Sequence, residues 1–239
     1  MKLSSPEALC PNCRLSDLCL PYGLQENEVK QLAAIVKNKR PLPTDDILYW
    51  QGDECQSLYV VKSGCFRSFI TDLDGNEQTI GFHLPGELMG LDAINHERFT
   101  CFTVALETSS VCELPISRLN DLCSKIPNLQ IQMLRILGKE IASGHDQIVL
   151  LGHHSAKERM AIFLLSLSCR YGALGFSGTE FNLSMPRHNI ANFLGITAET
   201  VSRQLADLGR LGVITVKQRG VQINDLNLLK AIVEPCSAK

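Results

Sequence analysis

The chain has 239 residues, of which 45% are hydrophobic and 20% charged, with 17 Gly, 10 Pro and a formal net charge of −2. This composition excludes a disordered, collagen-like or purely coiled-coil chain, and the length allows one or two domains with full-sized cores. The 10 Cys residues are many for an intracellular protein, yet too few for a small disulfide scaffold.

Neither the first residues nor the apolar runs indicate targeting to a membrane. Residues 1–19 lack a basic stretch followed by an apolar one, and the longest apolar run, residues 160–169, is too short to cross a bilayer. We therefore expect a cytoplasmic protein with reduced cysteines. In that compartment, cysteine spacing indicates metal or redox chemistry before disulfides.

Charge is unevenly distributed along the sequence. Residues 155–239 contain 10 Lys+Arg and 6 Asp+Glu, whereas residues 1–154 contain 13 and 19. A basic C-terminal part joined to an acidic N-terminal part favours nucleic-acid binding at the C-terminal end.

The first half of the chain changes its periodicity twice. Residues 1–19 are rich in Cys and read as irregular, and residues 27–39 have the apolar spacing of a short amphipathic helix. Between residues 47 and 115, short β-rich runs alternate with turn signals at a spacing of about 10–12 residues. This pattern predicts an antiparallel roll, and Asp74-Gly75 marks an exposed hairpin turn within it.

Residues 117–152 are predicted to form one long helix. Six of its residues follow alternating spacings of three and four, which is typical of a helix–helix seam: Leu134, Leu137, Ile141, Gly144, Ile148 and Leu151. The partner could be the helix's own domain or a second copy of the chain, and the length of the run favours a dimer. Gly144 costs a helix about 1 kcal/mol relative to Ala, so the middle of this helix should be only marginally stable.

The C-terminal part has the element order of a winged helix-turn-helix. A helix over residues 155–171 begins with the capping box of Ser155 and Glu158. Further predicted elements are a strand over 180–184, helices over 187–194 and 198–211, a hairpin of 213–217 and 221–223, and a last helix over 225–232. Gly195 permits the tight turn between the two middle helices, and this order is typical of DNA-binding proteins.

The second helix of this motif presents three polar residues near its N-terminus. Arg203 can donate two hydrogen bonds to guanine, Glu199 can accept from cytosine, and Ser202 can contact a base or a phosphate. The basic residues expected at the DNA backbone are Arg187, His188, Lys217 and Arg219. The alternative is that Glu199 and Arg203 form an ordinary surface ion pair.

Three cysteines lie close together near the N-terminus. Cys10 and Cys13 are separated by two residues, and Cys19 follows after five more. Three thiolates in a segment without its own core suit a zinc or iron–sulfur centre, which needs a fourth ligand. Spacing cannot choose that ligand among the other seven: Cys55, Cys65, Cys101, Cys112, Cys123, Cys169 and Cys236. The alternative is a mobile tail with free thiols.

The N-terminal cysteine pattern and the winged helix-turn-helix pattern together closely resemble those of the oxygen-sensing Fnr regulators of the Crp/Fnr family of transcription factors. The resemblance covers essentially the whole chain. It is carried by the Cys10, Cys13, Cys19 spacing and by the sequences GFHLPGELMGLDAI, ALETSSVCELP, KIPNLQIQMLRILGKEI and ITAETVSRQL.

The resemblance implies an α+β fold: an N-terminal antiparallel β-roll of cyclic-nucleotide-binding type, a long dimerisation helix and a C-terminal winged helix-turn-helix. The implied parts are a cysteine segment (1–19), the roll (20–116), the helix (117–152) and the DNA-binding domain (153–239). It also implies Cys112 as the fourth ligand of a [4Fe–4S] cluster. The resemblance further implies a homodimer that binds a palindrome similar to TTGAT-N4-ATCAA. Oxygen would convert the cluster to [2Fe–2S] and thereby release the DNA. RNA polymerase is an expected partner.

The main alternative is a regulator of the same fold that responds to zinc or to a small ligand such as a cyclic nucleotide. Gly86-Glu87-Leu88 matches the nucleotide-binding relatives, but Phe102 stands where those relatives have an arginine for the phosphate. An iron–sulfur redox enzyme is a further alternative. The sequence has no P-loop, nucleophile elbow or Rossmann fingerprint, so we expect no enzyme activity.

Overall fold

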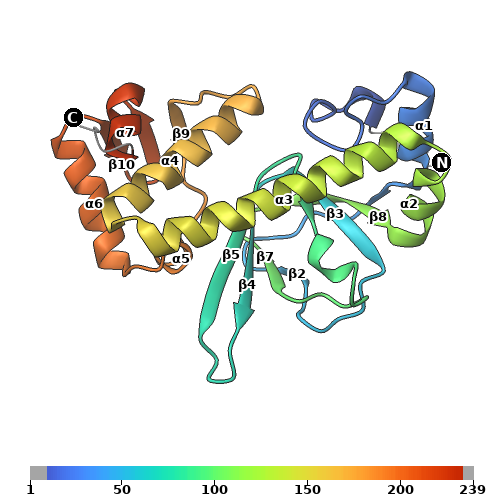
Figure 1. Cartoon of the computed structure of the whole chain (residues 1–239), viewed down its shortest axis with the longest axis horizontal. Helices are drawn as coiled ribbons and strands as arrows, with labels where there is room; N and C mark the ends of the chain where they lie inside the picture. The colour runs from blue at the N-terminus through green and yellow to red at the C-terminus, as the bar shows by residue number, and fades with distance from the viewer. Residues whose placement is uncertain (1–9, 234–239) are drawn as a thin grey trace, which may run out of the picture. The chain divides into compact units, whose positions relative to one another are not determined.

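The computed structural model describes residues 10–233, and the chain divides into two compact units (Figure 1). The first unit comprises Met1–Ile70 and Gly81–Ile141, and the second comprises Thr71–Ile80 and Ala142–Lys239. Cys236, one of the seven possible fourth ligands, lies outside the described residues. None of the described helices is long and apolar enough to cross a membrane.

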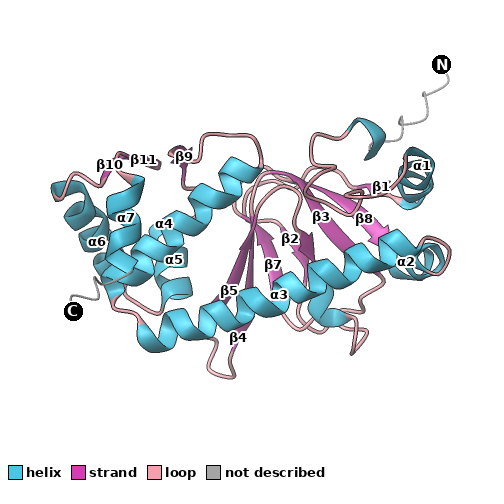
Figure 2. Cartoon of the chain, turned by 45° about the horizontal axis from the view of Figure 1, so that its top comes forward, coloured by secondary structure: helices cyan, strands magenta, loops and turns pink. Residues whose placement is uncertain are grey.

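Two four-stranded antiparallel sheets form the β-roll (Figure 2), which confirms the predicted fold class. One sheet has the strand order β1-β8-β3-β6 and the other β2-β7-β4-β5. The strands are β1 Lys37–Asn38, β2 Ile47–Tyr49, β3 Ser57–Ser63, β4 Phe66–Thr71, β5 Glu77–His83, β6 Leu88–Met89, β7 Phe102–Ala105 and β8 Ser110–Pro115. Gly64 separates β3 from β4 with a φ of +84°, and an added Cβ would lie only 2.1 Å from the Ser109 hydroxyl. Only glycine fits this turn.

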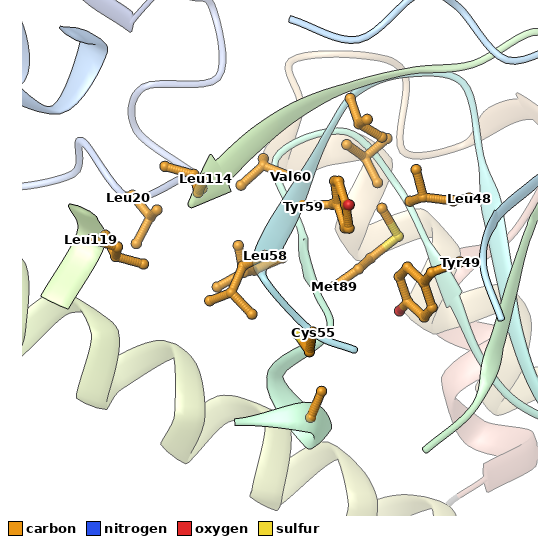
Figure 3. Close-up of a cluster of buried hydrophobic side chains, with 14 of the residues drawn as sticks. Leu20, Leu48, Tyr49, Cys55, Leu58, Tyr59, Val60, Met89, Leu114 and Leu119 are labelled. Atoms are coloured by element: carbon orange, nitrogen blue, oxygen red, sulfur yellow. The ribbon is translucent and has the colours of Figure 1, made fainter. Parts of the chain in front are cut away.

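Helices cover the sheet that contains β3 and β8. They are η1 Cys10–Asn12, α1 Glu26–Ile35, η2 Leu91–Ala93, α2 Ile116–Cys123 and the first part of α3 Pro127–His153. Figure 3 shows that Leu58, Leu114 and Leu119 point into one apolar interior, and Leu32 and Leu129 belong to the same buried cluster. Burial of such side chains stabilises a fold by about 1.5–3 kcal/mol each.

Two predicted helices in this unit have different ends from those expected. The helix predicted over residues 27–39 ends at Ile35, because Lys37 and Asn38 pair as a strand with β8. The single helix predicted over residues 117–152 is two helices, α2 and α3. Pro127 is the first residue of α3, and its ring disfavours helical backbone in the preceding residue.

The second unit is a winged helix-turn-helix, as predicted. It contains the end of α3, then α4 Ala156–Ala173, β9 Glu180–Asn182, α5 Arg187–Leu194, α6 Ala198–Arg210, β10 Ile214–Lys217, β11 Gly220–Ile223 and α7 Leu226–Val233. The capping box of Ser155 and Glu158 starts α4, with a 2.7 Å bond from the Ser155 N–H to the Glu158 carboxylate. The wing is the sheet β10-β11-β9.

The predicted hairpin turn between β4 and β5 also belongs to the second unit. Its tip, residues 72–78, is exposed, and the Asp72 carboxylate accepts backbone bonds from Asp74 and Asn76. The Gln78 amide donates to the Asn192 carbonyl at 2.9 Å, and the Asn192 amide donates to the Glu77 carbonyl at 2.6 Å. The turn is thereby held against α5.

Candidate metal centre and nucleic-acid interface

The three N-terminal cysteines lie on a segment wound into consecutive tight turns. The Cys13 N–H donates to the Cys10 carbonyl at 3.2 Å, and the Tyr22 N–H donates to the Cys19 carbonyl at 3.2 Å. Cys112 lies on β8, between its partners Asn38 on β1 and Val60 on β3. All four candidate ligand thiols are partly buried.

Neighbouring thiols contribute to the raised pKa values of Cys10, Cys19 and Cys112. The pKa of Cys19 is raised to about 12, chiefly by burial, and Cys10, Cys112 and Cys13 contribute to the rise. Burial likewise raises the pKa of Cys10 to about 11, with contributions from Cys112 and Cys13. Because such interactions weaken with distance, Cys10, Cys13, Cys19 and Cys112 share one neighbourhood.

The other described cysteines have different surroundings. Burial raises the pKa of Cys55 and of Cys101 to about 11, and the nearby charge in both cases is Asp92. Burial alone raises the pKa of Cys123. Cys55, Cys65 and Cys101 are buried, as free cysteines commonly are, whereas Cys169 is exposed on α4.

The donor set has the chemistry of a four-thiolate metal site. Thiolates bind zinc and iron–sulfur clusters, and a bound cation relieves the repulsion among buried anionic sulfurs. As placed here, however, no group of three or more His, Cys, Asp or Glu side chains within residues 10–233 is arranged to hold a metal ion. The four cysteines therefore have the right chemical type for such a centre, but their sulfur atoms are not arranged in a metal-coordinating geometry.

Two neighbouring residues that sequence reasoning missed complete the cysteine neighbourhood. The Lys62 ammonium opposes the effect of burial on the pKa of Cys112. The Gln132 amide on α3 donates to the Cys19 carbonyl at 3.3 Å, while its buried oxygen has no hydrogen-bond partner among residues 10–233. A buried polar side chain without charge gives no periodic signal in a sequence, so Gln132 could not be found from spacing.

The helix-turn-helix has the local geometry that its sequence predicts. Gly195 ends α5 in the left-handed conformation with a φ of +62°, and the Thr197 hydroxyl caps α6 by accepting from the Thr200 N–H at 3.1 Å. Ile190 and Val201 are fully buried where α5 packs on α6. The packing fixes which face of α6 remains in solvent.

That solvent face carries the predicted base-reading residues. Glu199, Ser202 and Arg203 are all exposed, and the Ser202 hydroxyl donates to the Ala198 carbonyl at 3.0 Å. In the part of the chain that the structure describes, Glu199 and Arg203 do not pair with each other, contrary to the surface-pair alternative. Both side chains are free to meet a ligand.

The four predicted backbone-binding residues divide into two kinds. His188, Lys217 and Arg219 are exposed around α5 and the wing. Arg187 is half-buried and donates to the Gln218 carbonyl at 3.3 Å, so it also ties α5 to the wing. Burial lowers the pKa of Arg187.

The predicted seam lies on an exposed face of α3. Leu134 and Ile141 are each 62% exposed and Ile148 is 70% exposed. Gly144 is exposed, whereas Leu137 and Leu151 are partly buried. Large apolar side chains aligned on a helix and open to water are typical of a surface that binds another protein.

Phe102, which stands where an arginine would be expected in a nucleotide-binding relative, packs among other aromatic rings. Phe102 on β7 stacks on Phe69 with ring centroids 5.1 Å apart, and it makes an edge-to-face contact with Trp50, with ring centroids 5.7 Å apart. An apolar ring cannot neutralise a cyclic phosphate.

Together, the roll and the winged helix-turn-helix define a DNA-binding transcription regulator. Residues 39–126 match the model of the cyclic nucleotide-binding domain, and residues 158–232 match the Crp-like helix-turn-helix domain. The solved structure of FixK2 from Bradyrhizobium japonicum is similar, with a TM-score of 0.76 and 26% identity, covering 83% of this chain and 97% of that chain.

Curated relatives are similar over nearly the whole chain. The anaerobic regulatory protein of Haemophilus influenzae is 44% identical over 91% of this chain and 85% of its own. Regulatory protein HlyX of Actinobacillus pleuropneumoniae is 44% identical over 92% of each chain, and the fumarate and nitrate reduction regulatory protein of Shigella dysenteriae is 43% identical over 92% and 88%. The chain belongs to the Crp/Fnr family of transcription regulators.

Proposed function

We propose that this chain is an oxygen-responsive transcription regulator that holds a [4Fe–4S] cluster with Cys10, Cys13, Cys19 and Cys112. The observation that carries the proposal is that one chain combines four partly buried candidate ligand thiols, three within residues 10–19 and one on β8, with a winged helix whose α6 exposes Glu199, Ser202 and Arg203. Relatives named as anaerobic regulators support it. When bound, the cluster would supply an oxygen-labile group that orders the cysteine segment.

Residues of this chain connect that segment to dimer formation. The Gln132 amide binds the Cys19 carbonyl from α3, the helix whose opposite face carries the exposed seam. Ordering of the cysteine segment would therefore bias α3 toward the conformation that pairs with a second copy. A few kcal/mol suffice for such a shift.

The proposed dimer would bind palindromic DNA. Each copy would place Glu199, Ser202 and Arg203 of α6 in the major groove, and the two-fold symmetry of the protein would match that of a TTGAT-N4-ATCAA-like operator. We further propose a cytoplasmic regulator without enzyme activity that contacts RNA polymerase. The exposed turn at Asp74 and Gly75 is a candidate surface for that contact.

Anaerobic purification of the full chain tests the metal centre. We expect a brown protein with about four iron and four sulfide per chain. Air should remove the colour, dissociate the dimer in sedimentation and release a fluorescent operator duplex. A colourless protein with stoichiometric zinc would contradict the proposal and favour a zinc-responsive regulator, since the same four thiolates also suit zinc.

A further inference from the structure

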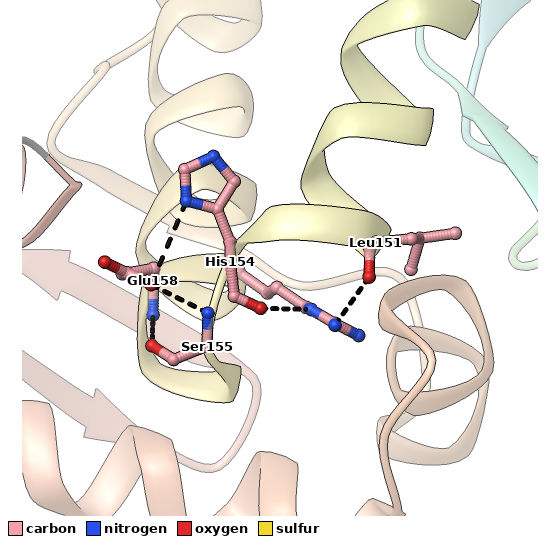
Figure 4. Close-up of polar contacts among 5 residues, drawn as sticks. Leu151, His154, Ser155 and Glu158 are labelled. Atoms are coloured by element: carbon pink, nitrogen blue, oxygen red, sulfur yellow. Dashed lines mark hydrogen bonds and ion pairs between the residues drawn. The ribbon is translucent and has the colours of Figure 1, made fainter.

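One arginine of α4 closes the junction between α3 and the helix-turn-helix. Arg159 donates three hydrogen bonds to main-chain carbonyls: Nε to His154 at 2.8 Å, Nη1 to Leu194 at 2.9 Å and Nη2 to Leu151 at 2.7 Å. Leu151 lies in the last turn of α3, and Leu194 is the last residue of α5. Figure 4 shows the carbonyls of Leu151 and His154 joined to the same guanidinium.

The chemistry of helix ends explains why an arginine occupies this position. The last carbonyls of a helix have no N–H partner within the helix, and they form the negative end of its dipole. A guanidinium is cationic and presents several N–H donors in one rigid plane. Arg159 therefore caps two helices and the connection after α3 at once, which fixes their relative orientation.

Two further contacts make this junction rigid. The Gln147 amide of α3 donates to the Phe193 carbonyl of α5 at 2.9 Å. A Cβ added to Gly195 would lie 3.2 Å from Leu151 Cδ2 and 3.4 Å from Arg159 Nη1. The turn between α5 and α6 is thus packed directly against the end of α3.

We propose that Arg159 is a positioning residue for DNA recognition, which sets the orientation of α6 relative to α3. The inference rests on the proposed dimer. Gly144, Ile148 and Leu151 of the seam lie on the part of α3 that shares a compact unit with α6. A fixed angle between seam and recognition helix sets the separation of the two α6 helices in a dimer, and hence the half-site spacing that it accepts.

The test compares Arg159→Met with the wild type in the anaerobic full chain. A second variant, Gln147→Leu, removes a single carbonyl contact, and Lys157→Met serves as a charge-matched control. Lys157 is also on α4 and has no hydrogen bond or ion pair with any described residue. Fluorescence anisotropy measures binding to palindromes with spacers of different length and to a single half-site. Sedimentation reports the dimer, and thermal melting reports folding.

We expect the wild type and Lys157→Met to prefer one spacer sharply. Arg159→Met should still dimerise and bind the half-site, but lose about tenfold or more in affinity at the preferred spacer, with a flattened preference. Gln147→Leu should show a smaller loss of affinity at the preferred spacer. If Arg159→Met does not fold, the spacer preference of Gln147→Leu tests whether the junction between α3 and α5 sets the half-site spacing. An unchanged spacer preference in a folded variant overturns the role of Arg159 alone, whereas a wild type without dimer or preference overturns the proposed function as well.

Discussion

At the scale of single residues, the candidate ligand thiols differ from the other cysteines in their neighbours. The sequence predicts Cys10, Cys13 and Cys19 because they are close in the chain. Cys112 is distant in sequence, and its place beside them depends on the pairing of β8 with β1 and β3. Only the resemblance to a family could indicate it before the strand order was known.

Replacing Cys112 by Ser should abolish binding of the iron–sulfur cluster, because a hydroxyl is a poor substitute for a thiolate ligand. Iron and sulfide analysis of the anaerobic protein measures the outcome. Cys123→Ser is the matched control, since Cys123 is also partly buried but outside the group of four. Full iron content in Cys112→Ser would show that the fourth ligand is another residue.

Gln132→Leu should stabilise the metal-free chain by about 1 kcal/mol. The Gln132 oxygen is buried without a hydrogen-bond partner in the part of the chain that the structure describes, which costs about 1–3 kcal/mol and exceeds the net gain from the hydrogen bond that the Gln132 amide donates to Cys19. Urea unfolding of the metal-free protein measures the change. Gln130→Leu on the exposed side of α3 is the control and should have little effect. Marked destabilisation by Gln132→Leu would contradict this account.

Arg203→Ala should weaken specific DNA binding by about 1–3 kcal/mol and leave nonspecific binding nearly unchanged. Arg203 is exposed on α6 and has no ion-pair partner among the described residues that it would leave behind. Competition between operator and random duplexes measures both quantities. Arg210→Ala at the other end of α6 is the control, because Arg210 is paired with Asp207. An equal loss on both duplexes would assign Arg203 to the phosphate backbone.

At the scale of elements, the sequence predicts helix and strand types well, and some boundaries less well. Ser155 and Thr197 cap the first turns of α4 and α6, and Gly195 ends α5, so these three boundaries lie within about one residue of the predicted ones. The end of α1 depends instead on pairing with β8, which is a contact between segments distant in sequence. The break before Pro127 had a local signal, but the apolar spacing on both sides obscured it.

Ile148→Glu should prevent dimer formation without destabilising the single chain. Ile148 is 70% exposed, so a charge there meets water in the monomer but would be buried, close to its copy, in a dimer. Sedimentation of the anaerobic protein measures the dimer, and thermal melting measures the fold. Lys139→Glu is the control, because Lys139 is exposed on α3 outside the seam. A persistent Ile148→Glu dimer would place the interface elsewhere.

At the scale of the whole molecule, a roll that matches the cyclic nucleotide-binding domain precedes a Crp-like helix-turn-helix, but Phe102 of that roll belongs to an aromatic stack. We expect cyclic nucleotides to leave its thermal stability unchanged, because Phe102 stacks on Phe69 where an arginine would be needed. A ligand at 100 times its Kd would raise the free energy of unfolding by about 2.7 kcal/mol. A cyclic-AMP-binding relative is the positive control, and a comparable rise here would favour the nucleotide alternative.

The division into two units occurs inside a helix, between Ile141 and Ala142 of α3. A fragment starting at Ala142 would therefore begin in mid-helix, with four backbone N–H groups that lack their acceptors. It would also retain Ile148 but lose Leu134 and Ile141, so half of the seam would be absent. Truncation at this boundary should therefore yield a DNA-binding fragment whose first helix is frayed.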